Sequence, residues 1–181
     1  MATRSQTQTA VLGALSIHPM TGYAVRENIR DVLGHFWSES FGQIYPTLAE
    51  LERQGLVERQ EPEHPRSAPF SATAAGLEKL RELLREPPQS PKPRNGLLLR
   101  LFFGRQLGAN ECRELIEAAR AQAEVQLVEL GAERRSLVEQ PDLDKDAPFI
   151  LLTIIAGEHG ARATIAWADD ALAILDEMLP A

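Results

Sequence analysis

Side chains that can contact nucleic acid are concentrated in one short segment of this chain. Residues 38–47 read Ser-Glu-Ser-Phe-Gly-Gln-Ile-Tyr-Pro-Thr. A glutamine amide can pair through two hydrogen bonds with an adenine edge, and a tyrosine can contact a phosphate or a thymine methyl group. If a helix starts in this segment, its N-terminus also attracts phosphate. The segment therefore predicts a DNA-contacting surface made by Ser38, Ser40, Gln43, Tyr45 and Thr47.

Two further groups of side chains lie just upstream. Tyr23 stands at the start of an expected helix and either contacts DNA or packs on the next helix. Arg26 and Arg30 lie four residues apart, so they share a helix face, but Glu27 and Asp31 alternate with them. Such alternation is typical of a solvated, ion-paired face at least as much as of phosphate contact.

Residue patterns for catalysis or metal binding are lacking in the sequence. There is no glycine-rich phosphate loop, no nucleophile elbow and no paired-carboxylate motif. His159 follows Glu158, but no second cluster at metal-ligand spacing accompanies them, so we interpret His159 as a helix-interface residue. The single cysteine, Cys112, is interpreted as structural. We expect no enzyme activity, no metal and no cofactor.

The first half of the chain carries the elements needed to position the polar segment. We expect helices at residues 8–16 and 22–33, the second with Thr21 as N-cap. A third helix is expected to start near residues 40–42 and to run to residue 54, with Ile44, Leu48 and Leu51 as the buried stripe. Gly34 and Gly55 end the second and third helices, and Pro46 is tolerable only in a first helical turn. Strands at residues 56–60 and 70–73 and a helix at 74–85, capped by Thr73, follow. This order is that of a winged helix-turn-helix.

The second half is expected to be helical and to self-associate. Residues 87–96 hold four prolines and a glycine and are interpreted as a linker. Helices are expected at residues 96–106, 110–140 and 147–179. Ile116, Ala123, Leu130 and Leu137 recur every seven residues, as in a packed helix. The last helix carries a mostly apolar face, with Gly157 and Gly160 allowing close approach; its residues are Phe149, Leu152, Ile155, His159, Ala163, Ala166, Asp170, Ala173 and Leu175.

This apolar surface exceeds what two helices can bury, which indicates an oligomer interface. Candidate residues for that interface or for a ligand are Phe102, Phe103 and Trp167. Packing of Trp167 between helices is the favoured alternative, and Trp37 is expected in the core. The predicted domains are residues 1–86 for DNA binding, a linker at 87–96, and residues 97–181 for dimerisation.

Charge is divided unevenly between the two halves. The net charge of −7 arises entirely after the linker, because residues 1–95 hold 11 Lys/Arg and 11 Asp/Glu whereas residues 96–181 hold 8 and 15. A neutral half can bind DNA if its cations converge locally. The longest uninterrupted apolar run, residues 148–156, is too short to span a bilayer. With one cysteine and no signal-peptide pattern, we expect a cytoplasmic protein.

Several short motifs follow one another along the chain. They are Pro19-Met-Thr-Gly-Tyr23, Phe36-Trp-Ser38, Gly42-Gln-Ile-Tyr-Pro46, Leu51-Glu52, Gly55-Leu-Val57 and Thr73-Ala-Ala-Gly76, with Leu98-Leu-Arg-Leu-Phe-Phe-Gly104 and Trp167-Ala-Asp-Asp-Ala-Leu172 in the second half. Together these motifs resemble the PadR family of transcriptional regulators. The resemblance to the longer subfamily implies a repressor that dimerises through its C-terminal helices and binds inverted repeats. Some members respond to phenolic acids or drug-like molecules.

The chain departs from this family pattern at two places. Thr21 stands where members often carry histidine, and the wing, usually rich in basic residues, offers only Arg66 with His64 nearby. Weak contact between wing and DNA is therefore expected.

Together these features predict a mainly α fold with a small β-hairpin: a winged helix-turn-helix followed by a C-terminal antiparallel helical dimerisation domain. The predicted function is a sequence-specific repressor that binds a palindromic operator in double-stranded DNA as a homodimer, with a small aromatic inducer as a candidate partner and no membrane association. The alternative is a winged-helix protein-interaction module that has lost DNA binding.

Overall fold

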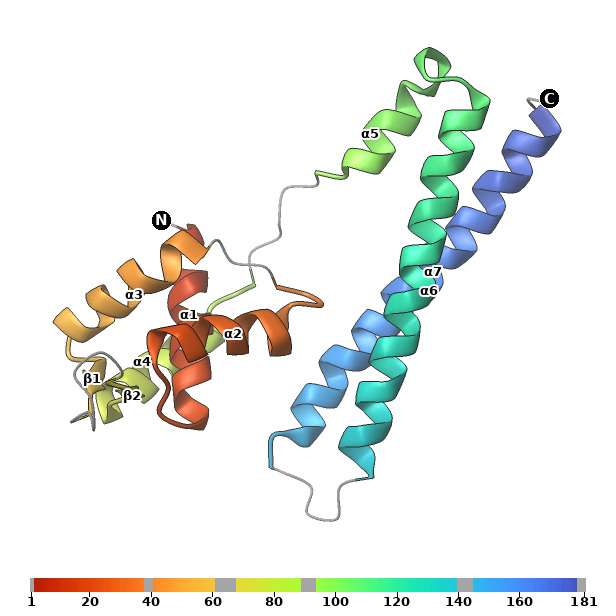
Figure 1. The fold of residues 1–181 in the computed structure, drawn as a ribbon. Helices are drawn as coiled ribbons and strands as arrows, with labels where there is room; N and C mark the ends of the chain where they lie inside the picture. Colours follow the sequence, from red (N-terminus) through yellow and green to blue (C-terminus); the bar gives the residue numbers. More distant parts are fainter. Residues whose placement is uncertain (1, 38–40, 61–67, 89–93, 140–144, 179–181) are drawn as a thin grey trace. The chain divides into compact units, whose positions relative to one another are not determined.

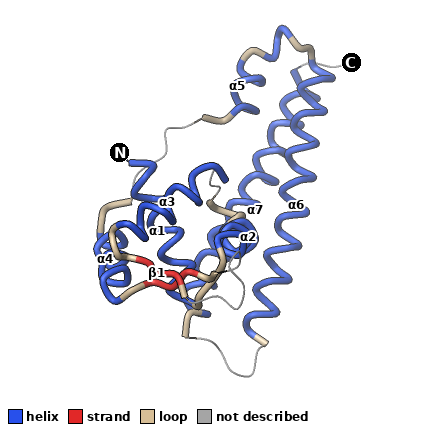
Figure 2. Tube along the Cα trace, turned by 60° about the vertical axis from the view of Figure 1, so that its left-hand side comes forward, coloured by secondary structure: helices blue, strands red, loops and turns tan. Residues whose placement is uncertain are grey.

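A computed structural model describes residues 2–37, 41–60, 68–88, 94–139 and 145–178. The chain divides into two compact units, Met1–Pro91 and Lys92–Ala181. In the described residues, the first holds four helices and a two-stranded antiparallel hairpin, and the second is helical (Figures 1 and 2). The predicted fold class is confirmed, whereas the domain boundaries at residues 86 and 97 stay a prediction.

The winged-helix unit follows the predicted element order. Its elements are α1 (Ala2–Ile17), α2 (Gly22–Leu33), α3 (Phe41–Arg53), β1 (Val57–Arg59), β2 (Phe70–Ala72) and α4 (Ala74–Arg85). Helix α1 begins six residues before the expected start at residue 8. Thr7 is buried together with Val11 and Ala14. This spacing places the three on one helix face, so tertiary packing extends the helix through a polar segment whose composition did not indicate it.

Hydrogen-bonding side chains define two helix starts as predicted. The Thr21 side chain accepts a hydrogen bond from the Ala24 N–H at 3.1 Å, and the Thr73 hydroxyl accepts one from the Gly76 N–H at 3.1 Å. Thr73 also donates to the Gly55 carbonyl at 2.8 Å, which ties the start of α4 to the turn after α3. Each cap satisfies a helix N–H that lacks an intrahelical partner.

Helix α3 ends in a left-handed glycine turn. Gly55 has a φ of 69°. Its N–H donates to the Glu52 carbonyl at 2.9 Å, and the Leu56 N–H donates to the Leu51 carbonyl at 2.9 Å. This pair of bonds is the Schellman arrangement. The turn directs the chain into β1, where Arg59 pairs with Phe70 of β2, and Phe70 in turn exchanges two backbone hydrogen bonds with Met20.

Gly76 allows α4 to approach the turn after α3. A Cβ at this position would lie 1.9 Å from the Leu56 carbonyl oxygen, whereas a Cβ on Gly13 in α1 would meet nothing within 4 Å. Because the obstructing atom is backbone, we expect Gly76→Ala to lower the free energy of unfolding by about 1–3 kcal/mol. Gly13→Ala, the matched control, should raise it by about 0.5–1 kcal/mol. Urea denaturation measures both, and an unchanged midpoint for Gly76→Ala would contradict this packing.

The second unit is built on two long antiparallel helices, α6 (Ala109–Val138) and α7 (Ala147–Met178), which lie side by side (Figure 1). The seven-residue stripe of α6 is confirmed for Ile116, Ala123 and Leu130, which are buried, while Leu137 is half-buried. On α7 the residues facing α6 are different from the apolar face in the prediction. They are Ala147, Ile154, Glu158, Ala161 and Ala168.

The helix expected at residues 96–106 is interrupted. It consists of α5 (Gly96–Phe102) and a 3-10 turn (Gly104–Gln106). A Cβ on Gly104 would lie 2.7 Å from the Cys112 Sγ, so this turn packs closely on α6. Cys112 is buried there, in accord with a structural role.

Helix α7 is also apolar over a greater length than the longest uninterrupted run suggested. Between Ala147 and Glu177 it is long and apolar enough to cross a membrane by length and composition alone. Its buried Glu158 carboxylate is paired with arginines of α6 and α7. Such pairing is what a helix packed within protein needs, because an ionic group in lipid is costly.

Candidate nucleic-acid interface

Helices α2 and α3 form the helix-turn-helix. Ile44, Leu48 and Leu51 of α3 are fully buried, as predicted, and pack in the core with Val25 and Ile29 of α2. This packing leaves the other face of α3 open to solvent. Gln43 is exposed there, and 53% of Tyr45 is exposed.

Thr47 does not belong to this exposed face. We predicted it to be exposed, but it is buried, with 7% of its surface accessible. Thr47 lies three residues after Ile44, so a helix places both side chains on the same side. The prediction that Thr47 contacts DNA is therefore wrong.

The ring of Tyr45 is positioned by a glycine of the preceding helix. A Cβ on Gly22 would lie 2.8 Å from Tyr45 Cε1 and 3.4 Å from a methyl carbon of Leu48. The absence of a side chain at Gly22 thus lets the start of α2 approach α3 through Tyr45. One side of the ring packs on α2, while the rest remains accessible to a ligand.

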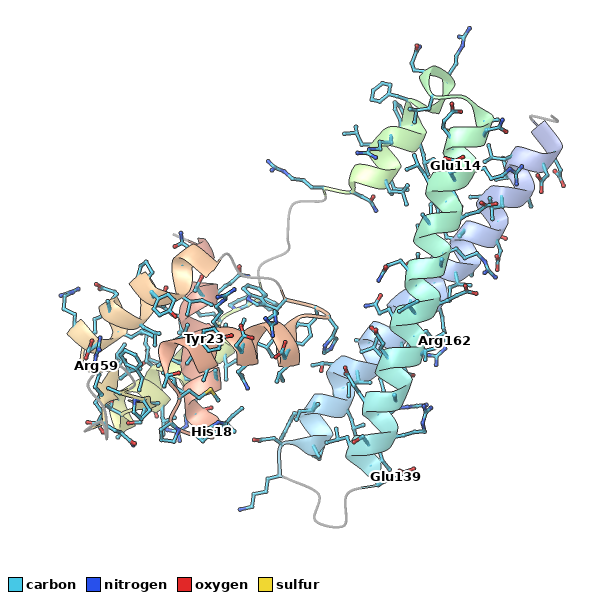
Figure 3. The ribbon with its side chains drawn as sticks, in the orientation of Figure 1. His18, Tyr23, Arg59, Glu114, Glu139 and Arg162 are labelled. Atoms are coloured by element: carbon cyan, nitrogen blue, oxygen red, sulfur yellow. The ribbon has the colours of Figure 1, made fainter. Side chains whose placement is uncertain are left out.

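Tyr23 follows Gly22 in the chain at the start of α2 and is labelled in Figure 3. It is 60% exposed, and the Arg26 guanidinium lies 5.9 Å from the centre of its ring. Tyr23 is therefore not buried against the next helix, which was the alternative to DNA contact. An exposed tyrosine beside a cation is suited to contact a phosphate.

Pro46 lies deeper in α3 than we expected. It is the sixth residue of the helix, beyond the first turn. Because proline has no N–H, the carbonyl of Gly42 lacks its usual intrahelical donor. Gly42 is exposed, so this carbonyl is open to water or to another partner.

Three predicted contact residues, Ser38, Ser40 and Arg66, lie outside the described residues. The expectation that the wing contacts DNA only weakly concerns the same part of the chain.

The described cations of the winged-helix unit are engaged with carboxylates. Within residues 5–37, 41–60 and 68–88, every lysine and arginine side chain lies within 4 Å of an Asp or Glu oxygen. Arg30 contacts Glu27 at 2.6 Å and Asp31 at 2.7 Å. Its hydrogen bond holds the pKa of the Asp31 carboxyl below its usual value. The prediction that this face of α2 is solvated and ion-paired is confirmed.

The α3 and β1 arginines are paired in the same way. Arg53 contacts Glu50 at 2.6 Å, and Arg59, labelled in Figure 3, contacts Glu52 at 2.8 Å. The hydrogen bonds that Arg53 donates to the Glu50 carboxylate raise the pKa of Arg53 above its usual value. Each of these described cations must therefore share or leave its carboxylate partner to reach a phosphate, which limits the electrostatic gain of DNA binding.

The predicted ligand or dimer residues of the second unit are largely accessible. Phe102 and Phe103 are 83% and 58% exposed, with their rings edge-to-face at 5.1 Å between centroids. Trp167 is half-buried on α7, and His159 is exposed on the same helix. Most of the predicted apolar face of α7, including Phe149 and Leu152, is likewise exposed.

The sequence interpretation missed the role of Glu158. Its side chain is 3% exposed and lies 3.2 Å from Arg134 of α6 and 3.0 Å from Arg162 of α7. Two further ion pairs join the helices, Arg120 to Asp169 and Arg113 to Asp176. The signal was present, because Arg113, Arg120 and Arg134 are spaced by multiples of seven and therefore follow one face of α6.

Two family models match consecutive parts of this chain. A model described as Transcriptional regulator PadR-like family matches residues 11–82, and one described as Virulence activator alpha C-term matches residues 93–176. The chain therefore carries a PadR-like transcriptional-regulator domain followed by a virulence-activator C-terminal domain. The PadR-like domain contains both α2 and α3, and the C-terminal model spans α5 to α7.

Similar proteins agree in length as well as in fold. The negative transcriptional regulator PadR of Bacillus subtilis is 22% identical over 93% of this chain and 96% of its own. Its structure in complex with operator DNA superposes with a TM-score of 0.78 at 22% identity, covering 93% and 98% of the two chains. The virulence activator AphA of Vibrio cholerae is 26% identical, with a TM-score of 0.74 and coverage of 95% and 99%.

This PadR-like chain is therefore a DNA-binding transcriptional regulator and not an enzyme. Among the residues that the structure describes, no three His, Cys, Asp or Glu side chains group together as metal ligands.

Because Glu158 is buried and its arginine partners are partly exposed, removing the carboxylate charge and removing the two arginines should lower the free energy of unfolding by different amounts. Glu158→Gln leaves two arginines that are 46% and 49% exposed and can be hydrated, so we expect a loss of about 1 kcal/mol in unfolding free energy. Replacing Arg134 and Arg162 together with methionine leaves a buried carboxylate without a partner, and we expect a loss of about 3 kcal/mol. Urea denaturation measures both variants.

Glu124→Gln, at the exposed pair with Arg120, is the control and should cost less than about 0.5 kcal/mol. Equal losses for Glu158→Gln and the double arginine variant would show that Glu158 is hydrated in solution.

Proposed function

We propose that this chain is a repressor that binds an inverted-repeat operator as a homodimer. In this proposal each subunit inserts α3 into the major groove, and the two half-sites lie about one helical turn, or a multiple of it, apart. The observation that carries the proposal is the exposed face of α3, where Gln43 and Tyr45 project away from a fully packed core. The similar Bacillus subtilis protein bears the name of a negative regulator and was solved with operator DNA, which supports the same role.

The proposed DNA contacts are Tyr23, Gln43 and Tyr45, joined by Ser38, Ser40 and Arg66. Gln43 reads a base edge, and the two tyrosines contact phosphates or a thymine methyl group. Thr47 has no part in this surface because it is buried.

A second copy is needed to cover the α6–α7 pair. Among the buried residues described on the two long helices, only Ile116, Leu130 and Ile154 are large aliphatic side chains. By contrast, Phe149 and Leu152 of α7 are 68% and 66% exposed. Because a stable helical pair must bury its apolar face, we assign this face to a homodimer interface, with Phe102, Phe103 and Trp167 as further candidates.

A small-molecule inducer that releases the operator completes the proposal. The similar PadR of Bacillus subtilis was also solved with p-coumaric acid, with a TM-score of 0.74 at 22% identity. A regulator of this kind acts where the chromosome is, so we place it in the cytoplasm.

The salt dependence of operator binding tests the electrostatic part of this proposal. Because the described cations of the winged-helix unit are already ion-paired, few counterions are released on binding. We expect the logarithm of the binding constant to fall with the logarithm of salt concentration with a slope of magnitude about 4–6, rather than 10. Fluorescence anisotropy with the footprinted upstream fragment of its own gene gives this slope.

A scrambled fragment of equal length is the control for specific binding. A slope near 10 would mean that a basic surface was overlooked. No binding to any upstream fragment would instead favour the second candidate function, a protein-interaction module, which the ion-paired cations also suit.

A further inference from the structure

The described part of the contact between α6 and α7 contains a regular series of ion pairs. Arg113 pairs with Asp176, and Arg120 pairs with Asp169 at 2.7 Å. A step of seven residues forward along α6 thus corresponds to seven residues back along α7, as in an antiparallel helical pair. Each of these two arginines has a carboxylate across the contact, so neither leaves a positive charge over.

The series is broken at its next position. The same register would join Leu127 of α6 to Arg162 of α7, and leucine carries no charge. Arg162, labelled in Figure 3, instead lies 3.0 Å from Glu158 of its own helix, and Arg134 of α6 lies 3.2 Å from the same carboxylate. Each guanidinium has five N–H donors, and one carboxylate cannot engage the donors of both. Two arginines therefore share one negative charge.

A third arginine adds to this excess of positive charge. Arg135 is exposed on α6, and among the described residues no carboxylate lies within 4 Å of its side chain. Its guanidinium lies close to Gly131, because a Cβ on that glycine would come 3.6 Å from Nη1. The three arginines and their one carboxylate thus leave two positive charges without a contacting partner, although residues 96–181 have a net charge of −7.

These three arginines line a hollow between α6 and α7. Its volume is about 300 Å³, and Leu127 and Val128 supply apolar surface on the α6 side. Glu158 is the one carboxylate among the residues of this lining. Its side chain is 3% exposed, whereas those of Arg134 and Arg162 are 46% and 49% exposed. The accessible charge around the hollow is therefore positive.

A phosphate group suits such a lining. A phosphomonoester carries a charge of about −1.5 to −2 at pH 7, which matches the two uncompensated positive charges. Arginine binds phosphate oxygens through paired N–H donors, and guanidiniums on two helices can reach different oxygens of a tetrahedral group. The volume and the apolar side chains leave space for a small substituent beside the phosphate.

We propose that this hollow binds the phosphate group of a small molecule, held by Arg134, Arg135 and Arg162. The site goes beyond the proposed function, because it lies in the helical unit and requires neither DNA nor a second copy. A bound phosphate joins α6 to α7. Since a ligand that binds only the folded state stabilises it, phosphate also raises the melting temperature of the protein.

Isothermal titration calorimetry of the full-length protein, in chloride buffer of constant ionic strength, tests the site. The probes are inorganic phosphate, n-butyl phosphate and butyrate. We expect both phosphates to bind saturably and at least about tenfold more tightly than butyrate, which carries one charge and two oxygens. Tighter binding of butyl phosphate than of inorganic phosphate would identify an ester as the ligand, and equal binding would identify free phosphate.

Variants at two exposed arginines show whether the hollow is where phosphate binds. Arg135→Gln removes one guanidinium from the lining and should weaken phosphate binding about tenfold. Arg105→Gln is the matched control, because Arg105 is exposed on the 3-10 turn and does not belong to the lining, and it should leave the affinity unchanged.

A carboxylate introduced into the hollow should replace the ligand. Gly131→Glu places one beside the arginines, at a position where a Cβ meets only the end of the Arg135 side chain. We expect this variant to lose phosphate binding and to melt about 2–4 °C above Gly131→Ala, the matched control, which should still bind phosphate. Circular dichroism records both melting curves.

The inference is overturned if phosphate shows no saturable binding below about 10 mM, as when a second copy covers the hollow, or if butyrate binds as tightly as phosphate. Equal phosphate affinities of Arg135→Gln and Arg105→Gln would also overturn it, as would full phosphate binding by Gly131→Glu.

Discussion

Introducing two charges on the exposed face of α7, as Phe149→Glu with Leu152→Glu, is expected to yield a monomer that binds the palindromic operator at least about 100-fold more weakly. The two side chains are 68% and 66% exposed and lie three residues apart, so they share one helix face. In a dimer interface a buried unpaired carboxylate is strongly unfavourable.

The loss of operator affinity follows from the loss of bivalency. Two linked recognition helices bind far more tightly than one, because the second contact is made at high effective concentration, typically a gain of about 10²–10⁴. The winged-helix unit has no surplus charge with which to compensate, since residues 1–95 carry equal numbers of acidic and basic residues. The acidic helical half would therefore be required for tight operator binding because it holds the two copies together.

Sedimentation equilibrium gives the oligomeric state, and anisotropy with a full palindrome and a single half-site gives the affinities. Gln122→Glu with Ser136→Glu is the matched control, because it adds the same charge at two exposed polar positions of α6. The control should remain dimeric. A Phe149/Leu152 variant that stays dimeric and binds the palindrome normally would move the interface to another face.

Replacing Tyr45 by alanine is expected to weaken operator binding by roughly 30-fold while the protein stays folded and dimeric. A truncated contact that costs about 1 kcal/mol in each subunit is counted twice in a symmetric complex. Tyr45 is suited to such a contact because its ring is held on one side by the start of α2, where a Cβ on Gly22 would lie 2.8 Å from it. Little conformational freedom is lost when an ordered side chain binds.

Tyr45→Phe separates the ring from the hydroxyl. It keeps the packing on Gly22, so it should retain most of the affinity if the ring contacts a thymine methyl group and lose most of it if the hydroxyl contacts phosphate. Urea denaturation and sedimentation of both variants establish that fold and dimer are intact. Unchanged operator binding by Tyr45→Ala would remove this residue from the interface.

Local sequence signals determined the winged helix to a large extent. The apolar residues Ile44, Leu48 and Leu51 recur with helical spacing and are all buried, and Thr73 caps α4 as its residue type predicts. Gly55 ends α3 with a positive φ, which glycine adopts without the steric cost of a Cβ. These features depend on neighbours within a few positions along the chain, which is why the sequence was sufficient.

Positions at the edge of a helix face were not determined in this way. Thr47 is a small polar residue that suits either side of α3, and only the packing of the core places it inside. Similarly, the early start of α1 depends on the burial of Thr7 against the rest of the winged helix, since its polar neighbours have no strong preference.

The two faces of α7 show most clearly the difference between what local sequence determines and what tertiary packing determines. The bulky residues Phe149 and Leu152 stand out in the sequence, yet three of the five buried residues on the opposite face are alanines, Ala147, Ala161 and Ala168. Small side chains let two helices approach closely, so packing rather than hydrophobicity selects that face.

Glu158 is a further example, because the side chain of a glutamate in an isolated helix is expected to be exposed to water. Its burial is decided by Arg134, which is 24 positions away in the sequence and reaches it only when α6 and α7 lie antiparallel. The sequence by itself therefore determined the order of the winged-helix elements and the caps Thr21 and Thr73. Only the tertiary structure decided which faces pair, because a charge or a small side chain gains its meaning from a partner that is distant in the chain.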